Sequence, residues 1–237
     1  MMVLFAWSDF VFLTYYPITS SLGVNDGLVS TFLLVVGVVG AGLSATDVLL
    51  TAIAGALAGA VSMAAGEYMA TKSQNQVFNG EIKLERNHIS IYNRDELQEL
   101  SSLLDVIGID AAEIELREQI TAYYKKHPEN LLKIMMALEF GVVDSVFRSP
   151  WKAAVYSGLL FTMGALPSVL PFLAKDANVG LAIAAGATTM ALLIVGFVKA
   201  WATRGNCLTA GIENVVVACV GGSLAYGVGV FFDMVLN

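Results

Sequence analysis

Residues 52–88 read AIAGALAGAVSMAAGEYMATKSQNQVFNGEIKLERNH, and this stretch decides the fold. Its first half is apolar enough to cross a bilayer, and its second half is charged. It contains no proline, and Gly80 is its only glycine after Gly66, which favours one long helix. At 1.5 Å per residue, about 37 residues span roughly 55 Å, well beyond a hydrocarbon core of roughly 30 Å. The sequence therefore predicts a membrane helix that continues into water.

Two stripes of side chains follow this predicted helix, because residues three or four apart share a face. The stripe in the apolar half consists of Gly55, Gly59, Met63 and Glu67. The stripe in the charged half consists of Glu81, Glu85 and His88. Sulfur, carboxylate and imidazole are ligands of soft or borderline metal ions. The pattern suggests a metal ion that moves between the two halves.

The composition indicates a membrane protein. Hydrophobic residues make up 57% of the 237-residue chain and charged residues 14%, and the mean hydropathy is +0.70. These values are too apolar for a soluble domain of this size. The net charge of −7 argues against a nucleic-acid partner. The two cysteines form no CxxC pair, so we expect neither a disulfide framework nor a thiolate metal site.

The charged residues are concentrated in one segment. Residues 72–149 hold 13 of the 20 acidic side chains, 9 of the 13 basic ones and both histidines. We therefore expect three parts: an N-terminal segment with two spans in 1–71, a polar helical insert in 72–149, and three spans in 150–237. The five predicted spans are 18–43, 48–69, 151–174, 179–201 and 210–235. The expected fold is an all-α integral membrane protein.

The insert and the connections between spans carry further local signals. Helices are predicted at 95–107, 111–126 and 129–140, separated by Gly108 and by His127-Pro128. Residues 44–47 read as a turn and helix cap before the second span. The insert and the loop with Lys199 and Arg204 lie on one side of the membrane, and the opposite side has only Lys175 among basic residues. The positive-inside rule therefore places the insert and the N-terminus in the cytosol. Residues 1–16 lack the features of a signal peptide, and we expect an interfacial or partial helix there.

Three residues of the spans are the first candidate ligands. Asp26 is followed by nearly a full span of apolar residues, and a carboxylate at membrane depth marks a pathway or proton site. Met63 lies one helical turn before Glu67, and a thioether suits Fe²⁺ or a similar ion but not Na⁺, Mg²⁺ or Ca²⁺. Glu67 lies near the cytosolic end of its span, where it either binds metal or reaches to water.

The insert holds three more groups of ligand-type residues. Each group lies within one helical turn; they are Glu85 with His88, Glu96 with Glu99, and Met135 and Met136 with Glu139. A solvated charged face explains any one of these groups, but it does not explain paired methionines beside a carboxylate. We therefore predict a metal-binding insert.

Two functions fit these ligands. A Glu-x-x-His at positions 85–88 is typical of di-iron carboxylate bundles, which would make the protein a membrane-bound oxidase. That architecture needs a second Glu-x-x-His, and Tyr124 stands three residues before the other histidine, His127. A transporter accounts for every candidate residue without a missing partner, so transport is the favoured interpretation and the protein is not expected to be an enzyme.

The chain also resembles the vacuolar iron transporter family from about Leu22 onward. The resemblance rests on Asn25-Asp26-Gly27-Leu28-Val29-Ser30, on Ser62-Met63-Ala64-Ala65-Gly66-Glu67-Tyr68 with Lys72-Ser73-Gln74, and on Met135-Met136-x-x-Glu139. It implies a homodimer with five transmembrane helices per subunit, which exports Fe²⁺ from the cytosol into a vacuole or other organelle in exchange for protons. Mn²⁺ and Zn²⁺ are further ions that such ligands accept.

The resemblance also assigns roles to single residues. It implies that Asp26 and Met63 bind the ion within the membrane, on a path at the dimer interface. It implies that the cytosolic domain binds metal through Glu85, Glu96, Glu99, Met135, Met136 and Glu139. The sequence departs from plant members at three positions: His88 stands where they carry Glu, Gly55 replaces a Glu low in the second span, and Glu67 replaces a small residue.

Overall fold

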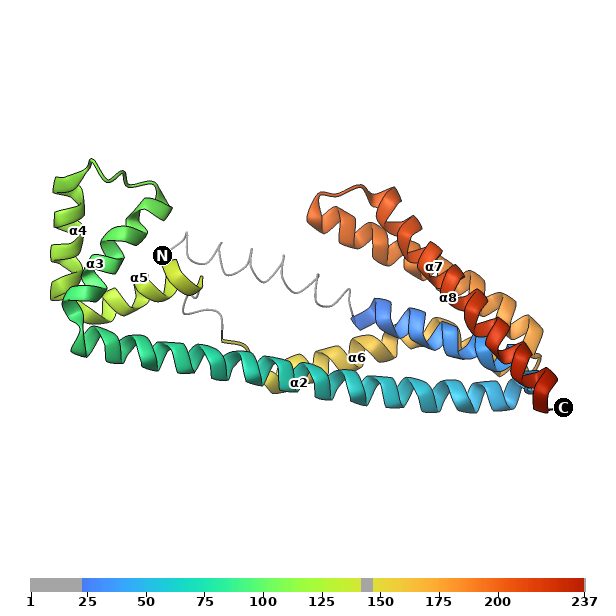
Figure 1. The fold of residues 1–237 in the computed structure, drawn as a ribbon. Helices are drawn as coiled ribbons and strands as arrows, with labels where there is room; N and C mark the ends of the chain where they lie inside the picture. Colours follow the sequence, from blue (N-terminus) through green and yellow to red (C-terminus); the bar gives the residue numbers. More distant parts are fainter. Residues whose placement is uncertain (1–22, 142–146, 237) are drawn as a thin grey trace. The chain divides into compact units, whose positions relative to one another are not determined.

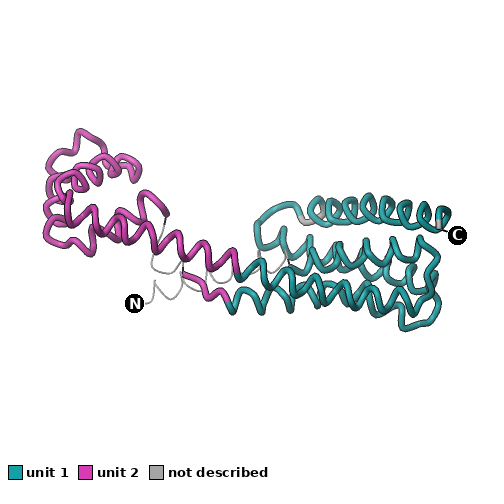
Figure 2. The backbone as a smooth tube through the Cα atoms, turned by 60° about the horizontal axis from the view of Figure 1, so that its bottom comes forward, with its two compact units in different colours: residues 1–68, 151–237 teal, residues 69–150 magenta. Residues whose placement is uncertain are grey.

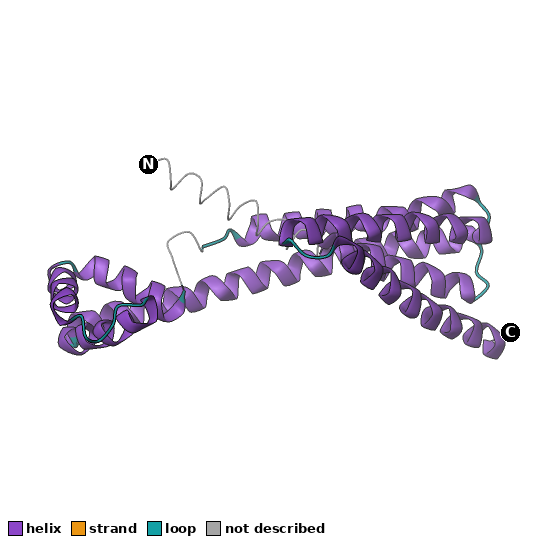
Figure 3. Cartoon of the chain, turned by 90° about the horizontal axis from the view of Figure 1, so that it is seen from above, coloured by secondary structure: helices purple, strands orange, loops and turns teal. Residues whose placement is uncertain are grey.

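The computed structural model describes residues 23–141 and 147–236. Every regular element in this part of the chain is an α-helix or a 3₁₀ helix, as Figure 3 shows. The prediction of an all-α fold is therefore confirmed for the described residues. The interfacial or partial helix expected at residues 1–16 lies outside them, as does the start of the first predicted span.

The long helix is α2, which runs without a break over Ala45–Ile91 (47 residues). It contains the whole predicted stretch 52–88. It begins three residues before the predicted second span, because the backbone N–H of Asp47 donates to Ser44 Oγ at 3.3 Å and the Ser44 hydroxyl donates to Asp47 Oδ2 at 2.6 Å. This pair satisfies backbone groups that the first turn of a helix leaves free.

Among the described residues, five helices are long and apolar enough to cross a membrane, which agrees with the predicted number of spans. They are the first described helix Gly23–Gly40, α2, α6 (Pro150–Val169) with η3 (Leu170–Ala174), α7 (Ala177–Thr203) and α8 (Cys207–Leu236). Pro167 lies inside α6, and the chain changes to 3₁₀ geometry at Leu170, just before Pro171. Proline lacks the backbone N–H that an α-helix needs, which explains the change of geometry at this end of the span.

The described residues divide into two compact units, coloured separately in Figure 2. The membrane unit holds the residues up to Tyr68 and from Trp151 onward, and the insert unit holds those from Met69 to Pro150. Helix α2 contributes its first half to one unit and its second half to the other (Figure 1).

In the membrane unit, glycines let helix backbones touch. A Cβ added to Gly27 would lie 2.1 Å from the carbonyl oxygen of Phe161, and one added to Gly164 would lie 2.2 Å from that of Val24. The first helix and α6 therefore cross backbone to backbone, which larger residues would prevent. Nearby, the buried hydroxyls of Ser168 and Thr188 share a 2.9 Å hydrogen bond between α6 and α7.

The insert unit consists of the second half of α2 with α3 (Asn93–Leu103), η1 (Leu104–Ile107), α4 (Ile114–Lys126) and α5 (Pro128–Phe140). Its helices enclose one apolar core, which includes Ile89, Leu100, Leu104, Leu131 and Met135. The predicted helix at 95–107 ends in a 3₁₀ turn, and the one predicted at 111–126 begins later, at Ile114.

The side chain of Arg117 explains the shape of the α3–α4 connection. Its guanidinium donates to the carbonyl oxygens of Ser101, Ile109 and Asp110 and pairs with the Asp105 carboxylate. These bonds occupy backbone acceptors that the end of α3 leaves without partners, so the connection is held in one conformation.

The backbone crossing predicts a large effect from one methyl group. We expect Gly164→Ala to destabilise the protein by about 1–3 kcal/mol, since neither backbone can yield without moving a helix. Gly186→Ala in α7 is the matched control, because a Cβ there meets no atom within 4 Å in the described structure. Thermal unfolding in detergent measures both. Equal melting temperatures for the two variants would contradict the crossing.

Candidate metal sites

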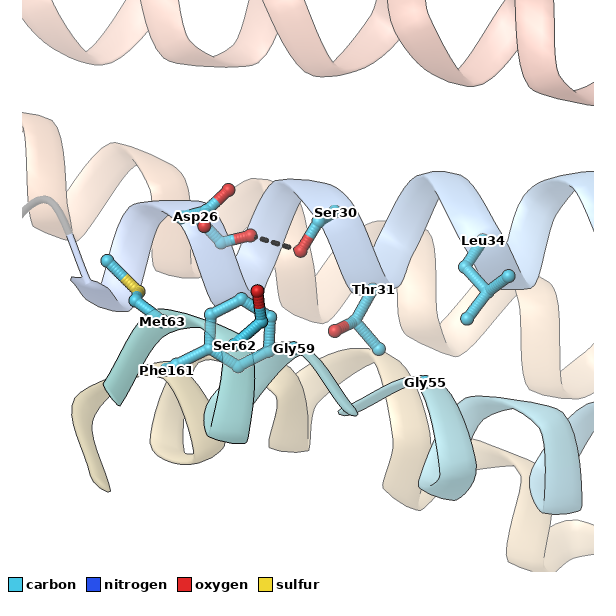
Figure 4. A pocket seen from close by; sticks show the side chains of 9 residues that line it. All are labelled: Asp26, Ser30, Thr31, Leu34, Gly55, Gly59, Ser62, Met63 and Phe161. Atoms are coloured by element: carbon cyan, nitrogen blue, oxygen red, sulfur yellow. Dashed lines mark hydrogen bonds between the residues drawn. The ribbon is translucent and has the colours of Figure 1, made fainter. Parts of the chain in front are cut away.

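A pocket of about 340 Å³ lies among the first helix, α2 and α6 in the membrane unit. Figure 4 shows its lining side chains, with Asp26 and Met63 at one end and Leu34 and Gly55 at the other. The pocket therefore brings together two of the three residues that the sequence singled out within the spans. The other lining residues are Ser30, Thr31, Gly59, Ser62 and Phe161.

Two glycines of α2 line the pocket and let the helix approach the opposite wall closely. A Cβ on Gly59 would lie 2.3 Å from Cζ of the Phe161 ring, and a Cβ on Gly55 would lie 2.3 Å from Cδ2 of Leu34. A methyl group at position 59 would overlap the Phe161 ring, and one at position 55 would require the Leu34 side chain to turn aside. Glycines four residues apart are typical of close helix packing, and here they accommodate Leu34 and Phe161.

The pocket offers donors of two chemical kinds. Asp26 supplies a carboxylate and Met63 a thioether, and the hydroxyls of Ser30, Thr31 and Ser62 add neutral oxygens. Ser30 is partly engaged, because its hydroxyl donates to the carbonyl oxygen of Asp26 at 2.5 Å. A mixed oxygen and sulfur set favours a borderline divalent ion over the hard ions Mg²⁺ and Ca²⁺.

Asp26 and Glu67 differ in their placement. Asp26 is exposed at the surface of the single chain although it belongs to an apolar span. Glu67 is half-buried on α2, one turn beyond Met63, and does not line the pocket. Among the described residues, Asp26 is thus the one carboxylate that lines this pocket.

A second group of ligand-type residues lies in the insert unit. Glu85, His88 and Glu96 each direct a ligand atom to within 4.8 Å of the others. Nδ1 of His88 lies 3.6 Å from Oε1 of Glu96. Glu85 and Glu96 are only 5% and 6% exposed, and Oε1 of Glu85 is buried with no hydrogen-bond partner in the described part of the chain. Such an arrangement is costly unless a cation neutralises it.

The carboxylates of this group disfavour one another's charge. Burial, together with the neighbouring carboxyl of Glu96, raises the pKa of Glu85 to about 8; Glu139 and Glu99 add to the effect. Burial and the carboxyl of Glu99 also raise the pKa of Glu139. Since all four carboxyl groups influence one another, Glu99 and Glu139 belong to the same cluster as Glu85 and Glu96.

The two predicted sulfur ligands occupy a different environment. Met135 and Met136 are buried at 0% and 4% exposure and pack in the apolar core of the insert unit. They lie on α5, which also carries Glu139 one turn later. The structure therefore gives both methionines a packing role, and their sulfurs remain only candidate ligands.

The structure also bears on the di-iron alternative. His127, the only other histidine of the chain, packs its ring 4.6 Å from the Tyr123 ring at the start of α5. It is not part of the group formed by Glu85, His88 and Glu96. A second Glu-x-x-His therefore has no counterpart in the described insert, and the oxidase interpretation is not favoured.

Three hydroxyl residues of the pocket were not predicted from the sequence. Ser30 and Ser62 stand inside the two quoted motifs but were not considered as ligands, and Thr31 was not singled out. Hydroxyl residues are common in transmembrane helices, where they bond to the helix backbone or to a neighbouring helix. The available signal was their spacing: Ser30 and Thr31 follow Asp26 by four and five residues, and Ser62 directly precedes Met63.

The comparisons with known proteins cover most of the chain. A family model described as the VIT family matches residues 20–230. "Vacuolar iron transporter 1" of Eucalyptus grandis is 29% identical over 210 residues, which cover 87% of this chain and 82% of that protein. The Arabidopsis thaliana protein of the same name is 29% identical, covering 86% and 81%. The "Vacuolar iron transporter" of Toxoplasma gondii is 28% identical, covering 91% and 74%.

The carboxylate cluster predicts how stability depends on pH. The pKa of Glu85 is raised in the folded protein, so the folded chain keeps a proton that the unfolded chain releases. The metal-free protein should therefore lose stability as pH rises from about 4.5 to about 8. Glu85→Gln should flatten this loss, and Glu118→Gln on exposed α4 should not. Melting curves measured across that range in the presence of a chelator test the expectation. A profile that Glu85→Gln leaves unchanged would contradict it.

Proposed function

The chain belongs to the VIT family, and on this premise we propose that it transports Fe²⁺ across a membrane. The family match confirms the resemblance that the sequence motifs indicated. The similar proteins are named as iron transporters, which supports a transporter and not an enzyme. The observation that carries the proposal is the pocket between spans, in which a carboxylate and a thioether lie together.

The insert is proposed to collect the ion. Glu85, His88 and Glu96 provide three ligand atoms in one place, and Glu99 and Glu139 extend the negative charge. A divalent cation would relieve the repulsion among these groups and satisfy the orphaned Oε1 of Glu85. Binding would release the protons that the metal-free cluster holds. The methionines of α5 are proposed as additional ligands, made available by rearrangement of the core.

The membrane pocket is proposed to carry the ion across. Asp26 and Met63 bind Fe²⁺, and the nearby hydroxyls replace part of its water shell. Protonation of Asp26 on the far side would weaken the carboxylate's hold on the ion, which couples metal release to a counter-movement of protons. Glu67, one turn from Met63 on α2, is proposed to guide the ion toward the pocket.

The setting of this transport is part of the proposal. We place the insert in the cytosol by its basic residues, the protein in a vacuolar or other organelle membrane by the names of its relatives, and the direction as export from the cytosol. We also propose a homodimer, because Asp26 is exposed on an apolar span and a second copy would cover it. Mn²⁺ and Zn²⁺ are competing substrates of the same ligands.

Asp26→Asn tests the membrane pocket. The amide keeps the size of the side chain but removes its charge, so we expect intact folding and a transport rate lower by about tenfold or more, a loss of about 1.4 kcal/mol or more. The control is Glu213→Gln, which removes an exposed carboxylate of α8 outside the pocket. Fe²⁺ uptake by reconstituted vesicles is the measurement. Unchanged uptake by Asp26→Asn would refute the proposed path.

A triple substitution tests the insert separately. Replacing Glu85, Glu96 and Glu99 by Ala should raise the Fe²⁺ concentration needed for half-maximal uptake by about 10- to 100-fold and leave some transport. Replacing Glu113, Glu115 and Glu118 by Ala removes the same number of carboxyl groups from exposed positions of the same unit and serves as control. An equal effect of both triples would show a general charge effect and no site.

A further inference from the structure

Phe161 of α6 is a large buried side chain that lines the membrane pocket. It is only 5% exposed. Figure 4 shows its ring at the end of the pocket where Asp26 and Met63 lie, next to Ser62. Unlike these neighbours, the ring has no oxygen or sulfur atom to offer an ion. The path described above therefore gives it no part as a ligand.

The apolar core of the membrane unit does not account for this ring. Ala165 and Val169 follow Phe161 at intervals of four residues on α6 and belong to a buried apolar cluster with Val48 and Ala52. Among the described residues, this cluster does not extend to Phe161. The ring instead faces a pocket lined by a carboxylate, three hydroxyl groups and a thioether. A buried aromatic ring usually gains its stability from apolar neighbours, so this placement calls for another explanation.

Two glycines fix the ring in position. The carbonyl oxygen of Phe161 lies where α6 crosses the first helix, only 2.1 Å from a Cβ added to Gly27. At the other end, Cζ, Cε1 and Cε2 of the ring lie 2.3, 2.6 and 3.3 Å from a Cβ added to Gly59. The tip of the ring therefore points at the backbone of α2 and fills the space between α6 and α2. Close contacts at both ends make the ring a rigid wall of the pocket.

A wall without oxygen atoms discriminates between classes of ion. Mg²⁺ demands octahedral geometry and gives up its water reluctantly, and Ca²⁺ takes about six to eight oxygen ligands. The ring occupies space that the water around such an ion would need. Fe²⁺ accepts the thioether of Met63 together with the carboxylate of Asp26, so it loses less when water is excluded.

We propose, on the basis of the transport function above, that Phe161 determines the ion selectivity of the pocket. Its ring excludes water from the side of the ion that faces α6, so hard ions that must keep an oxygen shell are rejected. Phe161 binds no ion itself. The wall needs the ring on α6 and the glycine at position 59 of α2, because a side chain there would push the ring away.

Phe161→Leu tests the wall, because leucine is apolar but lacks the outer atoms of the ring. The measurement is the concentration of Ca²⁺ and that of Mn²⁺ at which Fe²⁺ uptake by reconstituted vesicles is halved. The ratio of these concentrations, Ca²⁺ over Mn²⁺, should fall by about tenfold or more, since the vacated space admits water around Ca²⁺. The matched control is Phe172→Leu, which shortens a ring that is 2% exposed in the apolar core outside the pocket. It should leave the ratio unchanged.

Melting temperatures in detergent test the contact between the ring and α2. Gly59→Ala should lower the melting temperature, because its methyl group overlaps the ring. Adding Phe161→Leu to Gly59→Ala should raise it again, since leucine has no atom in the place of Cζ. Phe161→Leu and Phe172→Leu alone should each stay folded and melt below the unaltered protein.

The outcomes separate the role of Phe161 from the proposed transport. Fe²⁺ uptake with an unchanged ratio in Phe161→Leu would overturn the role of the ring and leave transport standing. An equal change in Phe172→Leu would reveal a general loss of packing, and a double variant no more stable than Gly59→Ala would disprove the contact; either result overturns the role as well. No Fe²⁺ uptake by the unaltered protein would refute the proposed function and the selectivity of Phe161 together.

Discussion

A carboxylate withdrawn from water is stable only when a cation or a proton offsets its charge, and both candidate sites depend on this constraint. In the insert unit, Glu85 and Glu96 are almost fully buried next to each other, and the folded chain responds by keeping a proton on the group. In the membrane unit, Asp26 belongs to an apolar span and lines a pocket whose other donors are neutral. A divalent cation answers both requirements, because its charge offsets burial and repulsion together.

The packing of the chain leaves room for these charges. Gly55 and Gly59 on α2 face Leu34 and Phe161 so closely that a methyl group would not fit, yet beside them the pocket stays open to Asp26 and Met63. In the insert, an apolar core that includes Ile89, Leu100 and Met135 supports the cluster from one side. Close packing next to polar groups is what holds a site ready for its ligand.

The sequence predicted the architecture well because its signals are local. An uninterrupted apolar run and the lack of proline predict α2, and hydropathy alone predicts five spans. Helix ends were less predictable: α2 begins early because Ser44 and Asp47 bond to each other, and α4 begins late, after the turn that Asp110 stabilises by accepting from the backbone N–H of Ala112. Such bonds depend on side-chain geometry, which periodicity does not report.

The candidate sites divide in the same way. The i, i+3 spacing identifies Glu85 and His88 as candidates. The same spacing does not predict that Glu85 is buried. The proximity of Glu99 and Glu139 joins residues 40 positions apart, so it emerges only from the packing of α3 and α5. The hydroxyls around Met63 were missed because transmembrane serine and threonine have a common structural use. In each case, contacts between distant segments supplied what spacing did not.

One measurement addresses the central claim, that the pocket of Asp26 and Met63 passes a borderline divalent ion against protons. Vesicles that contain the purified protein and an acidic interior are given Fe²⁺ outside, with and without an excess of Mn²⁺, Zn²⁺ or Mg²⁺. The account predicts Fe²⁺ uptake that stops when the pH gradient is collapsed, competition by Mn²⁺ or Zn²⁺, and none by Mg²⁺. Uptake that Mg²⁺ suppresses as strongly as Mn²⁺, or that ignores the pH gradient, would contradict it.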